Sequence, residues 1–175
     1  TNLGNYCTDT DDVEVFRYEN VPQAEVLPED PDCFGDENGS ITVNTNPDNG
    51  PYSFTLDGQN YGTSNYFAPL APGTYQIQIT DGQGCVWNTS VILAEPEELF
   101  VDLGADLVLN LGETANIQAQ FTVPVSQLDT LIWTPAMLLP CPEMPCDEQE
   151  FLPTQQTVVT LTAIDQNGCR AEDLL

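Results

Sequence analysis

Apolar and polar positions alternate along residues 73–93 in the way that a β-hairpin requires. Tyr75, Ile77 and Ile79 are separated by single polar residues, which is the period-two pattern of a half-buried strand. The Asp-Gly-Gln-Gly segment that follows consists of residues that favour tight turns. A second, largely apolar segment then completes the pair. The pattern therefore predicts an antiparallel hairpin.

The same hairpin pattern returns at residues 157–175, and a part of it lies near the N-terminus. A cysteine occupies the equivalent place in each copy, and Cys7, Cys85 and Cys169 are 78 and 84 residues apart. This spacing indicates a repeat of about one small β domain. We therefore expect a segment of a longer protein, with these parts: residues 1–21 as the closing strand or strands of a preceding β-sandwich, residues 22–95 as one complete sandwich, and residues 96–175 as another.

Short strands separated by turn residues account for most of the remaining chain. No stretch shows a sustained helical period. The expected strands are residues 24–27, 40–44, 51–56, 65–69, 73–80 and 85–93, then 99–103, 106–109, 113–121, 129–133, 157–164 and 169–175. Trp133 should fill the core of the second unit, and a proline-rich excursion follows at residues 135–153. The fold class is all-β, as tandem antiparallel immunoglobulin-like β-sandwiches.

Composition excludes several classes of function. The formal net charge is −26, with neither lysine nor histidine, so nucleic acid and anionic membrane surfaces should be repelled. Without histidine there is no Ser-His-Asp or Cys-His catalysis, and without lysine there is no Schiff base. No apolar run approaches 18 residues, so we expect no membrane insertion. Paired carboxylates could in principle hydrolyse glycosides, but none follows an apolar strand that would raise its pKa, and we expect no enzyme.

Six cysteines in small units with limited cores indicate disulfides and an oxidising, extracellular setting. Cys33 precedes the first sheet strand of its unit and Cys85 begins the last, so a Cys33–Cys85 disulfide would join the two ends of that unit. Cys141 and Cys146 lie close together in the proline-rich excursion and would close a short loop.

Cys7 and Cys169 are then left over. We expect Cys7 to pair with a residue upstream of residue 1, and Cys169 to be an unpaired core thiol or to join another chain. Two alternatives are reduced core cysteines throughout and a zinc site. The zinc site has neither CxxC-type spacing nor histidine in its favour.

An acidic turn between residues 28 and 39 contains weak calcium candidates. Asp32, Asp36 and Asn38 crowd into it, and Asp-Glu-Asn-Gly looks like part of a calcium loop, because calcium prefers several oxygen ligands from a tight turn. The twelve-residue spacing and its closing glutamate are missing. We therefore expect no cofactor, with calcium as the alternative.

Three segments of the first unit resemble the SprB-repeat family of cell-surface gliding-motility adhesins. They are CFGDENGSITV, GPYSFTLDG and LAPGTYQIQITDGQGCVWNTSVIL, within residues 33–95. Residues 99–175 resemble the immunoglobulin- or PKD-like domains that stand beside such repeats, on the segments 101–104 and 133–135, the Cys141 and Cys146 loop, and Asn-Gly-Cys at 167–169. Asn110 stands where this family usually has the partner of its final cysteine.

The resemblance implies a very long, secreted bacterial cell-surface protein, exported by the type IX route. The expected function is that of a structural and adhesive repeat segment in an extracellular stalk, filament or appendage. Its expected partners are neighbouring domains of the same chain and, through donated strands, further copies in a fibre or ring. The alternative is a recognition module of a surface adhesin that binds calcium or a cell-surface glycan, the glycan through exposed aromatic residues at Tyr52, Tyr61, Tyr66 and Phe67.

Overall fold

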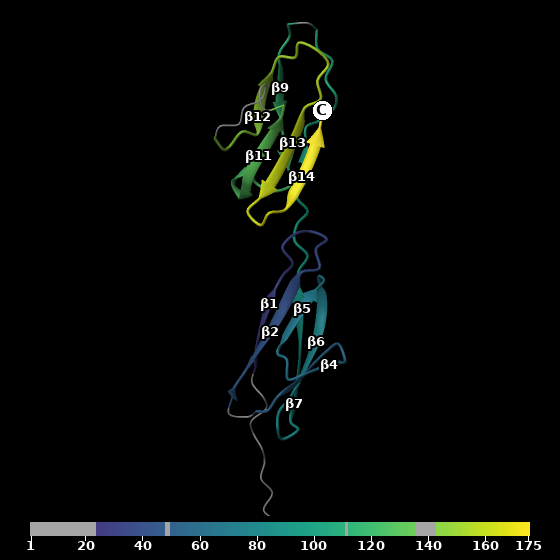
Figure 1. Ribbon diagram of the computed structural model, residues 1–175, viewed down its shortest axis with the longest axis vertical. Coiled ribbons are helices and arrows are strands. Elements are labelled where there is room, and N and C mark those ends of the chain that lie inside the picture. The colour runs from purple at the N-terminus through teal and green to yellow at the C-terminus, as the bar shows by residue number, and fades with distance from the viewer. Residues whose placement is uncertain (1–23, 48–49, 111, 136–142) are drawn as a thin grey trace, which may run out of the picture.

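The chain forms two β-sandwiches that follow one another along the long axis of the molecule (Figure 1). The computed structural model describes residues 24–47, 50–110, 112–135 and 143–175. The expected closing strands at residues 1–21 lie outside these residues. Two separate hydrophobic cores occur, one in each sandwich. The boundary that we propose between residues 95 and 96 lies in the segment that joins them.

The first sandwich packs a three-stranded sheet, in the order β1-β2-β5, against a four-stranded sheet, in the order β4-β3-β6-β7. All neighbouring strands are antiparallel. The strands are β1 (Ala24–Glu29), β2 (Gly39–Thr45), β3 (Ser53–Leu56), β4 (Gln59–Gly62), β5 (Tyr66–Leu70), β6 (Gly73–Thr80) and β7 (Val86–Leu93).

The alternation along β6 decides which of its side chains enter the core. Ile77 and Ile79 are 1% and 0% exposed, whereas the alternating Gln76 and Gln78 face solvent. The opposite sheet contributes Ile41, Val43 and Phe67, all fully buried. Burying a side chain of this size stabilises the fold by about 1.5–3 kcal/mol. The predicted hairpin of residues 73–93 is confirmed as the β6–β7 pair.

The second sandwich contains three small sheets, in the orders β11-β13-β14, β10-β8 and β12-β9. Its elements are β8 (Val101–Asp102), β9 (Ala115–Gln118), β10 (Gln120–Phe121), the 3₁₀ turn η2 (Val125–Gln127), β11 (Leu128–Thr134), β12 (Glu148–Phe151), β13 (Thr160–Asp165) and β14 (Arg170–Leu174). The β13–β14 hairpin corresponds to β6–β7, so the predicted repeat of the closing hairpin is confirmed.

Trp133 is a core residue, as the sequence predicts. Its side chain is 1% exposed, and its indole Nε1–H donates a hydrogen bond of 2.8 Å to the carbonyl oxygen of Cys146. Cys146 is itself buried in the second core. The end of the proline-rich excursion therefore packs back against the sandwich and satisfies its largest buried side chain.

Three strand predictions were wrong. No strand was expected between residues 56 and 65, but Asp57 and Gly58 alone make a turn, with φ of 46° and 82°, and β4 follows at once. An Asp-Gly pair between strands is a strong hairpin signal. β12 lies inside the expected proline-rich excursion. Residues 106–109 form no strand, and Val108 is 98% exposed.

Candidate functional site

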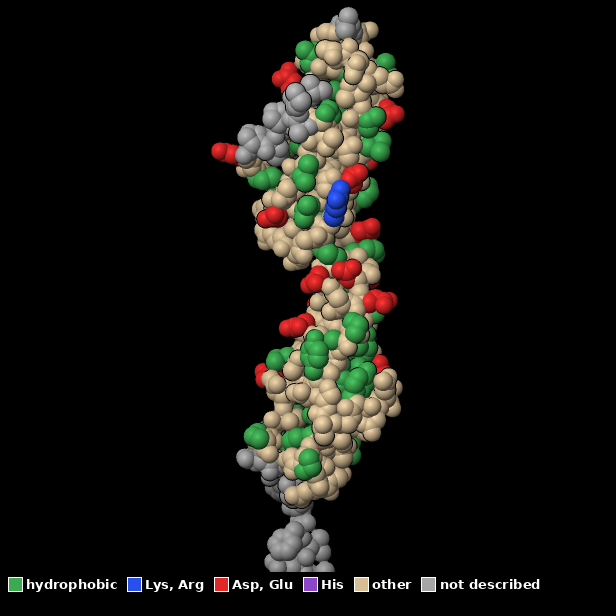
Figure 2. Space-filling view, viewed as in Figure 1, with side chains coloured by type: hydrophobic (Ala, Val, Ile, Leu, Met, Phe, Trp, Pro, Cys, Tyr) green, Lys and Arg blue, Asp and Glu red, His purple; other side chains and the backbone are tan. Residues whose placement is uncertain are grey.

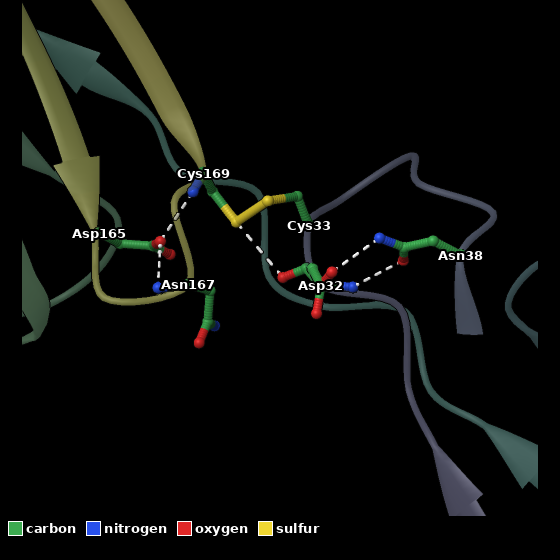
Figure 3. Close-up of a disulfide and its surroundings, with 6 residues drawn as sticks. All are labelled: Asp32, Cys33, Asn38, Asp165, Asn167 and Cys169. Atoms are coloured by element: carbon green, nitrogen blue, oxygen red, sulfur yellow. Dashed lines mark hydrogen bonds between the residues drawn. A yellow bond between two sulfur atoms is a disulfide. The ribbon is translucent and has the colours of Figure 1, made fainter. Parts of the chain in front are cut away.

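The joint between the two sandwiches is the most distinctive site among the described residues, and two turns build it. The first is the β13–β14 turn, where Asp165 organises the backbone. Its Oδ1 accepts hydrogen bonds of 2.9 Å from the N–H groups of Asn167 and Cys169. Gly168 takes the left-handed φ of 89° that the turn needs. The sequence Asp-Gln-Asn-Gly-Cys thus presents Cys169 at the end of the domain that faces the joint (Figure 3).

The second turn is the acidic loop between β1 and β2. The N–H of Asp32 donates to Asn38 Oδ1 over 3.0 Å, and Asn38 Nδ2 donates to Asp32 Oδ2 over 2.7 Å (Figure 3). Inside this clamp, the N–H of Asp36 donates to the carbonyl oxygen of Cys33 over 3.0 Å. Local sequence therefore fixes the position of Cys33.

Cys33 and Cys169 form a disulfide that crosses the joint (Figure 3). Their Cα atoms are 5.5 Å apart, although they are separated by 136 residues in sequence. This corrects two predictions: Cys33 does not pair with Cys85, which has a free thiol, and Cys169 is neither unpaired nor bonded to another chain.

The reason is the orientation of the first sandwich. Glu29 pairs with Ser40, and Leu93 lies against Gly39, so the acidic loop lies at the end of the domain where β7 finishes. Cys85 lies just before the start of β7, at the other end, because Val86 pairs with Thr80. Eight residues of extended chain separate the two ends by about 26 Å. A disulfide requires Cα atoms within about 7 Å.

The remaining cysteines are only partly described. Cys146 belongs to a disulfide, and its expected partner, Cys141, lies outside the described residues, so that pairing stays a prediction. Cys7 lies outside them too.

The segment between the domains is fixed at both ends by hydrogen bonds. The N–H of Ala94 donates to Asp30 Oδ1 over 2.7 Å. On the other side, the hydroxyl of Thr122 donates to the carbonyl oxygen of Glu98 over 2.7 Å, and its oxygen accepts from the N–H of Phe100. These contacts restrain the linker independently of the disulfide.

Acidic side chains gather around this narrow waist (Figure 2). An open hollow of about 340 Å³ lies there, lined by Asp30, Pro31, Asp32, Ala94, Glu95, Pro96 and Asn167. Among the described residues, no group of three or more Cys, Asp and Glu side chains is arranged to hold a metal ion. Of the three calcium candidates, Asp32 and Asn38 bind each other and Asp36 uses its backbone to hold Cys33.

Calcium should therefore leave the melting temperature of the chain unchanged at millimolar concentration. A ligand that binds only the folded state must raise stability, and this loop offers paired rather than converging oxygens. Thermal unfolding with calcium, compared with magnesium at equal ionic strength, measures this. A calcium-specific rise that disappears in Asp32→Asn would restore the calcium hypothesis.

Asp165→Ala should destabilise the second domain by about 1–3 kcal/mol, because two N–H groups lose their acceptor. Asp165→Asn is the matched control, since it keeps an oxygen at the same place and should cost less. Urea unfolding of the two variants gives the comparison. Equal losses would show that the carboxylate oxygen does not organise the turn.

Arg170, the one basic side chain among the described residues, follows the bridge on β14. Its guanidinium donates to Glu172 Oε2 over 2.9 Å, and the Thr162 hydroxyl donates to the same oxygen over 3.0 Å. The arginine first, and the hydroxyl second, hold the pKa of Glu172 below its ordinary value. A lowered pKa in the folded state gives a stabilisation that is present above the unfolded pKa and lost as pH falls.

Arg170→Gln should therefore raise the pKa of Glu172 towards its ordinary value. An NMR titration of the Glu172 side chain in the two proteins measures the change, with Glu150 as an exposed reference. An unchanged midpoint would contradict the role of the guanidinium.

The aromatic residues considered for glycan binding do not form an exposed set. Phe67 is fully buried, and Tyr61 packs edge-on against it with ring centroids 4.9 Å apart. Tyr52 packs against the same core, and its hydroxyl donates to the carbonyl oxygen of Asn46. Tyr66 is 54% exposed. The expectation of an exposed aromatic surface was wrong for Phe67.

Comparison with known families gives a match within the first domain. The model of the SprB repeat matches residues 28–60, a stretch that contains Cys33 and the acidic loop. The match confirms the predicted resemblance to the SprB repeat for these residues of the first domain. No curated protein matches the chain in sequence.

Several solved structures are similar at low identity. The fibronectin(III)-like modules of Clostridium thermocellum CbhA match at 14% identity and a TM-score of 0.37, over 87% of this chain and 91% of that one. A C-terminal fragment of intimin, solved with the intimin-binding domain of its receptor Tir, matches at 12% and 0.41, over 86% and 62%. Bacteroides ovatus SGBP-B, solved with a mixed-linkage heptasaccharide, matches at 16% and 0.28, over 87% and 46%.

Proposed function

We propose that this chain is a structural and adhesive repeat segment of a very long, secreted cell-surface protein, which builds an extracellular stalk, filament or appendage and withstands tension along it. The observation that carries the proposal is the Cys33–Cys169 disulfide across the joint. The SprB repeat supports a surface-exposed or secreted setting, and it suggests export by the type IX route and a link to gliding motility. The described residues include no helix that is long and apolar enough to cross a membrane.

The disulfide gives tension a short covalent path through both domains. β1 runs from Ala24 towards Cys33, and β14 runs from Cys169 towards the end of the second domain. Force applied along the chain would pass along β1, through the disulfide and along β14. The segment between the two cysteines, which contains most of both cores, would not be stretched.

The acidic surface suits a long extracellular assembly. A net charge of −26 keeps neighbouring copies apart at low salt and discourages nonspecific association. Disulfides persist in the oxidising setting outside the cell. No catalytic step forms part of the proposal.

Immunogold electron microscopy of cells that produce the protein tests this function. Antibody against the second domain should label thin structures that extend from the cell surface, and deletion of the gene should remove both label and structures. Label confined to the cell interior, or structures that persist after deletion, would refute the proposal.

A further inference from the structure

The turn that carries Cys85 repeats the turn that carries Cys169. Asp81 takes the place of Asp165, and its Oδ1 accepts from the N–H groups of Gln83 and Cys85 over 2.9 and 2.8 Å. The N–H of Asp81 donates to the carbonyl oxygen of Cys85 over 3.0 Å, as Asp165 does to Cys169. Gly84 has a φ of 85°, close to the 89° of its counterpart. The two cysteines are therefore held in the same way.

The Cys169 turn shows what such a cysteine does. It projects from the end at which the chain enters its domain and bonds a cysteine of the domain before it. The Cys85 turn also lies at the entry end of its domain, because Ala24 pairs with Thr45, at the opposite end of β1 and β2 from the acidic loop. Figure 1 shows the β6–β7 turn and the β13–β14 turn at the lower ends of their respective domains.

At the end of the first domain that carries Cys85, two groups have no bonding partner among the described residues. The thiol is free and partly exposed. Asp81 is 5% exposed, and its second carboxylate oxygen, Oδ2, has no hydrogen-bond partner in the described structure. A buried carboxylate oxygen without a donor is costly. The Cys85 end thus lacks both a covalent and a polar partner.

We propose that Cys85 forms the disulfide of the preceding joint, with a cysteine of the polypeptide that comes before Ala24. This deepens the proposed function and rests on it, because it requires a domain upstream. The partner would be presented by a β1–β2 loop of the kind that holds Cys33. Each such domain then contributes two cysteines. The one in its first loop bonds across the joint that follows the domain, and the one in its closing hairpin bonds across the joint that precedes it.

The second domain has no cysteine in its first loop that could bond to a domain following it. β8 lies beside β14 as β1 lies beside β7, so residues 103–114 correspond to the acidic loop. They contain no cysteine, and Asn110 is the residue that closes their turn, through its bonds with Glu113. A joint that follows residue 175 would therefore lack this disulfide, and the stiff part of the assembly would end there.

The bond forms by ordinary thiol–disulfide exchange. The Cys85 thiolate attacks the disulfide of an oxidant, such as a thiol–disulfide oxidoreductase or oxidised glutathione, and releases one thiol of the oxidant. The upstream thiolate then attacks the mixed disulfide and releases the second thiol. Two protons leave the cysteines, and two electrons reduce the oxidant's disulfide to two thiols.

Disulfide mapping of the full-length protein from the cell surface tests the proposal. Free thiols are blocked with iodoacetamide during extraction, and the unreduced protein is cleaved after Asp and Glu, except before proline, which releases Cys85 on the peptide GQGCVWNTSVILAEPE. We expect this peptide to be joined to one that lies before Ala24. The mass identifies the partner: a cysteine upstream of residue 1 supports the proposal, because Cys7 occupies the closing-hairpin place and not a first loop.

Four outcomes would overturn it: carbamidomethylated Cys85, a bond to Cys7, a bond to Cys33, or a bond to a separate chain. Filaments that form with free Cys85 would refute this inference and leave the proposed function standing. Cys85→Ser in the full-length protein should widen the bending seen by microscopy at the joint before Ala24. Cys169→Ser, the matched control, should widen it at the following joint instead.

Discussion

Substitution of Cys169 by serine should lengthen the mechanically extended chain by roughly 450 Å relative to the oxidised wild type. The disulfide encloses a segment with a sequence separation of 136 residues, and an extended chain spans about 3.3–3.6 Å per residue. In the wild type this segment cannot extend, because force bypasses it. In the variant, both domains can be pulled out. Single-molecule stretching with handles at the two chain ends measures the difference.

Cys85→Ser is the matched control for this experiment when residues 1–175 alone are stretched, because Cys85 has a free thiol in the described structure and its proposed partner lies outside that segment. It should leave the extension unchanged. Serine substitution is preferable to a reducing agent, which would also break the disulfide of Cys146. If the oxidised wild type extends as far as Cys169→Ser, the bridge does not carry the load.

The variant Trp133→Ala should lose about 3–5 kcal/mol in the second domain. The indole is 1% exposed and fills the centre of the core. Its removal also leaves the carbonyl oxygen of Cys146 without its donor. Because small domains have a total stability of about 5–15 kcal/mol, much of the second domain's stability should disappear.

The first domain provides an internal control, since its core is separate. Trp87, on β7, reports its unfolding by fluorescence, while circular dichroism follows both domains. Only the second-domain transition should move to lower urea. Trp133→Phe should cost less, because it retains an aromatic ring and loses mainly the hydrogen bond. A shift of both transitions by equal amounts would mean that the cores are not independent.

Local patterns predict the closing hairpins well. The alternation along residues 73–80 places Ile77 and Ile79 in the core because neighbouring side chains of a strand must face opposite sides, and both are buried. Trp133 was predicted correctly for a related reason, since a large aromatic side chain within an apolar strand has few other stable positions.

The disulfide could not be predicted in the same way. Its formation depends on which end of the first domain carries Cys33, and that follows from strand order and direction rather than from any local pattern. A Cys33–Cys85 disulfide is compatible with the order of the strands along the sequence, but it would require about 26 Å of strand to be bridged. The repeat itself contains the signal for the observed pairing. Cys169 occupies the same place in the second unit as Cys85 does in the first, at the end of its unit that faces the preceding one.

β12 was missed for a different reason. Its residues, Glu148–Phe151, are mostly polar and follow two prolines, so composition favours a loop. The strand exists because it pairs with β9 and places Phe151 in the core. Tertiary pairing thus overrides local preference.

Disulfide mapping of Cys33 in protein taken from the cell surface tests the central claim most directly. Cleavage after Asp and Glu, except before proline, releases Cys33 on the peptide CFGD, Cys169 on QNGCRAE and Cys85 on GQGCVWNTSVILAEPE, all of different mass. The account predicts that CFGD is recovered joined to QNGCRAE without reduction. Recovery of CFGD joined to the Cys85 peptide, or with a blocked free thiol, would contradict it.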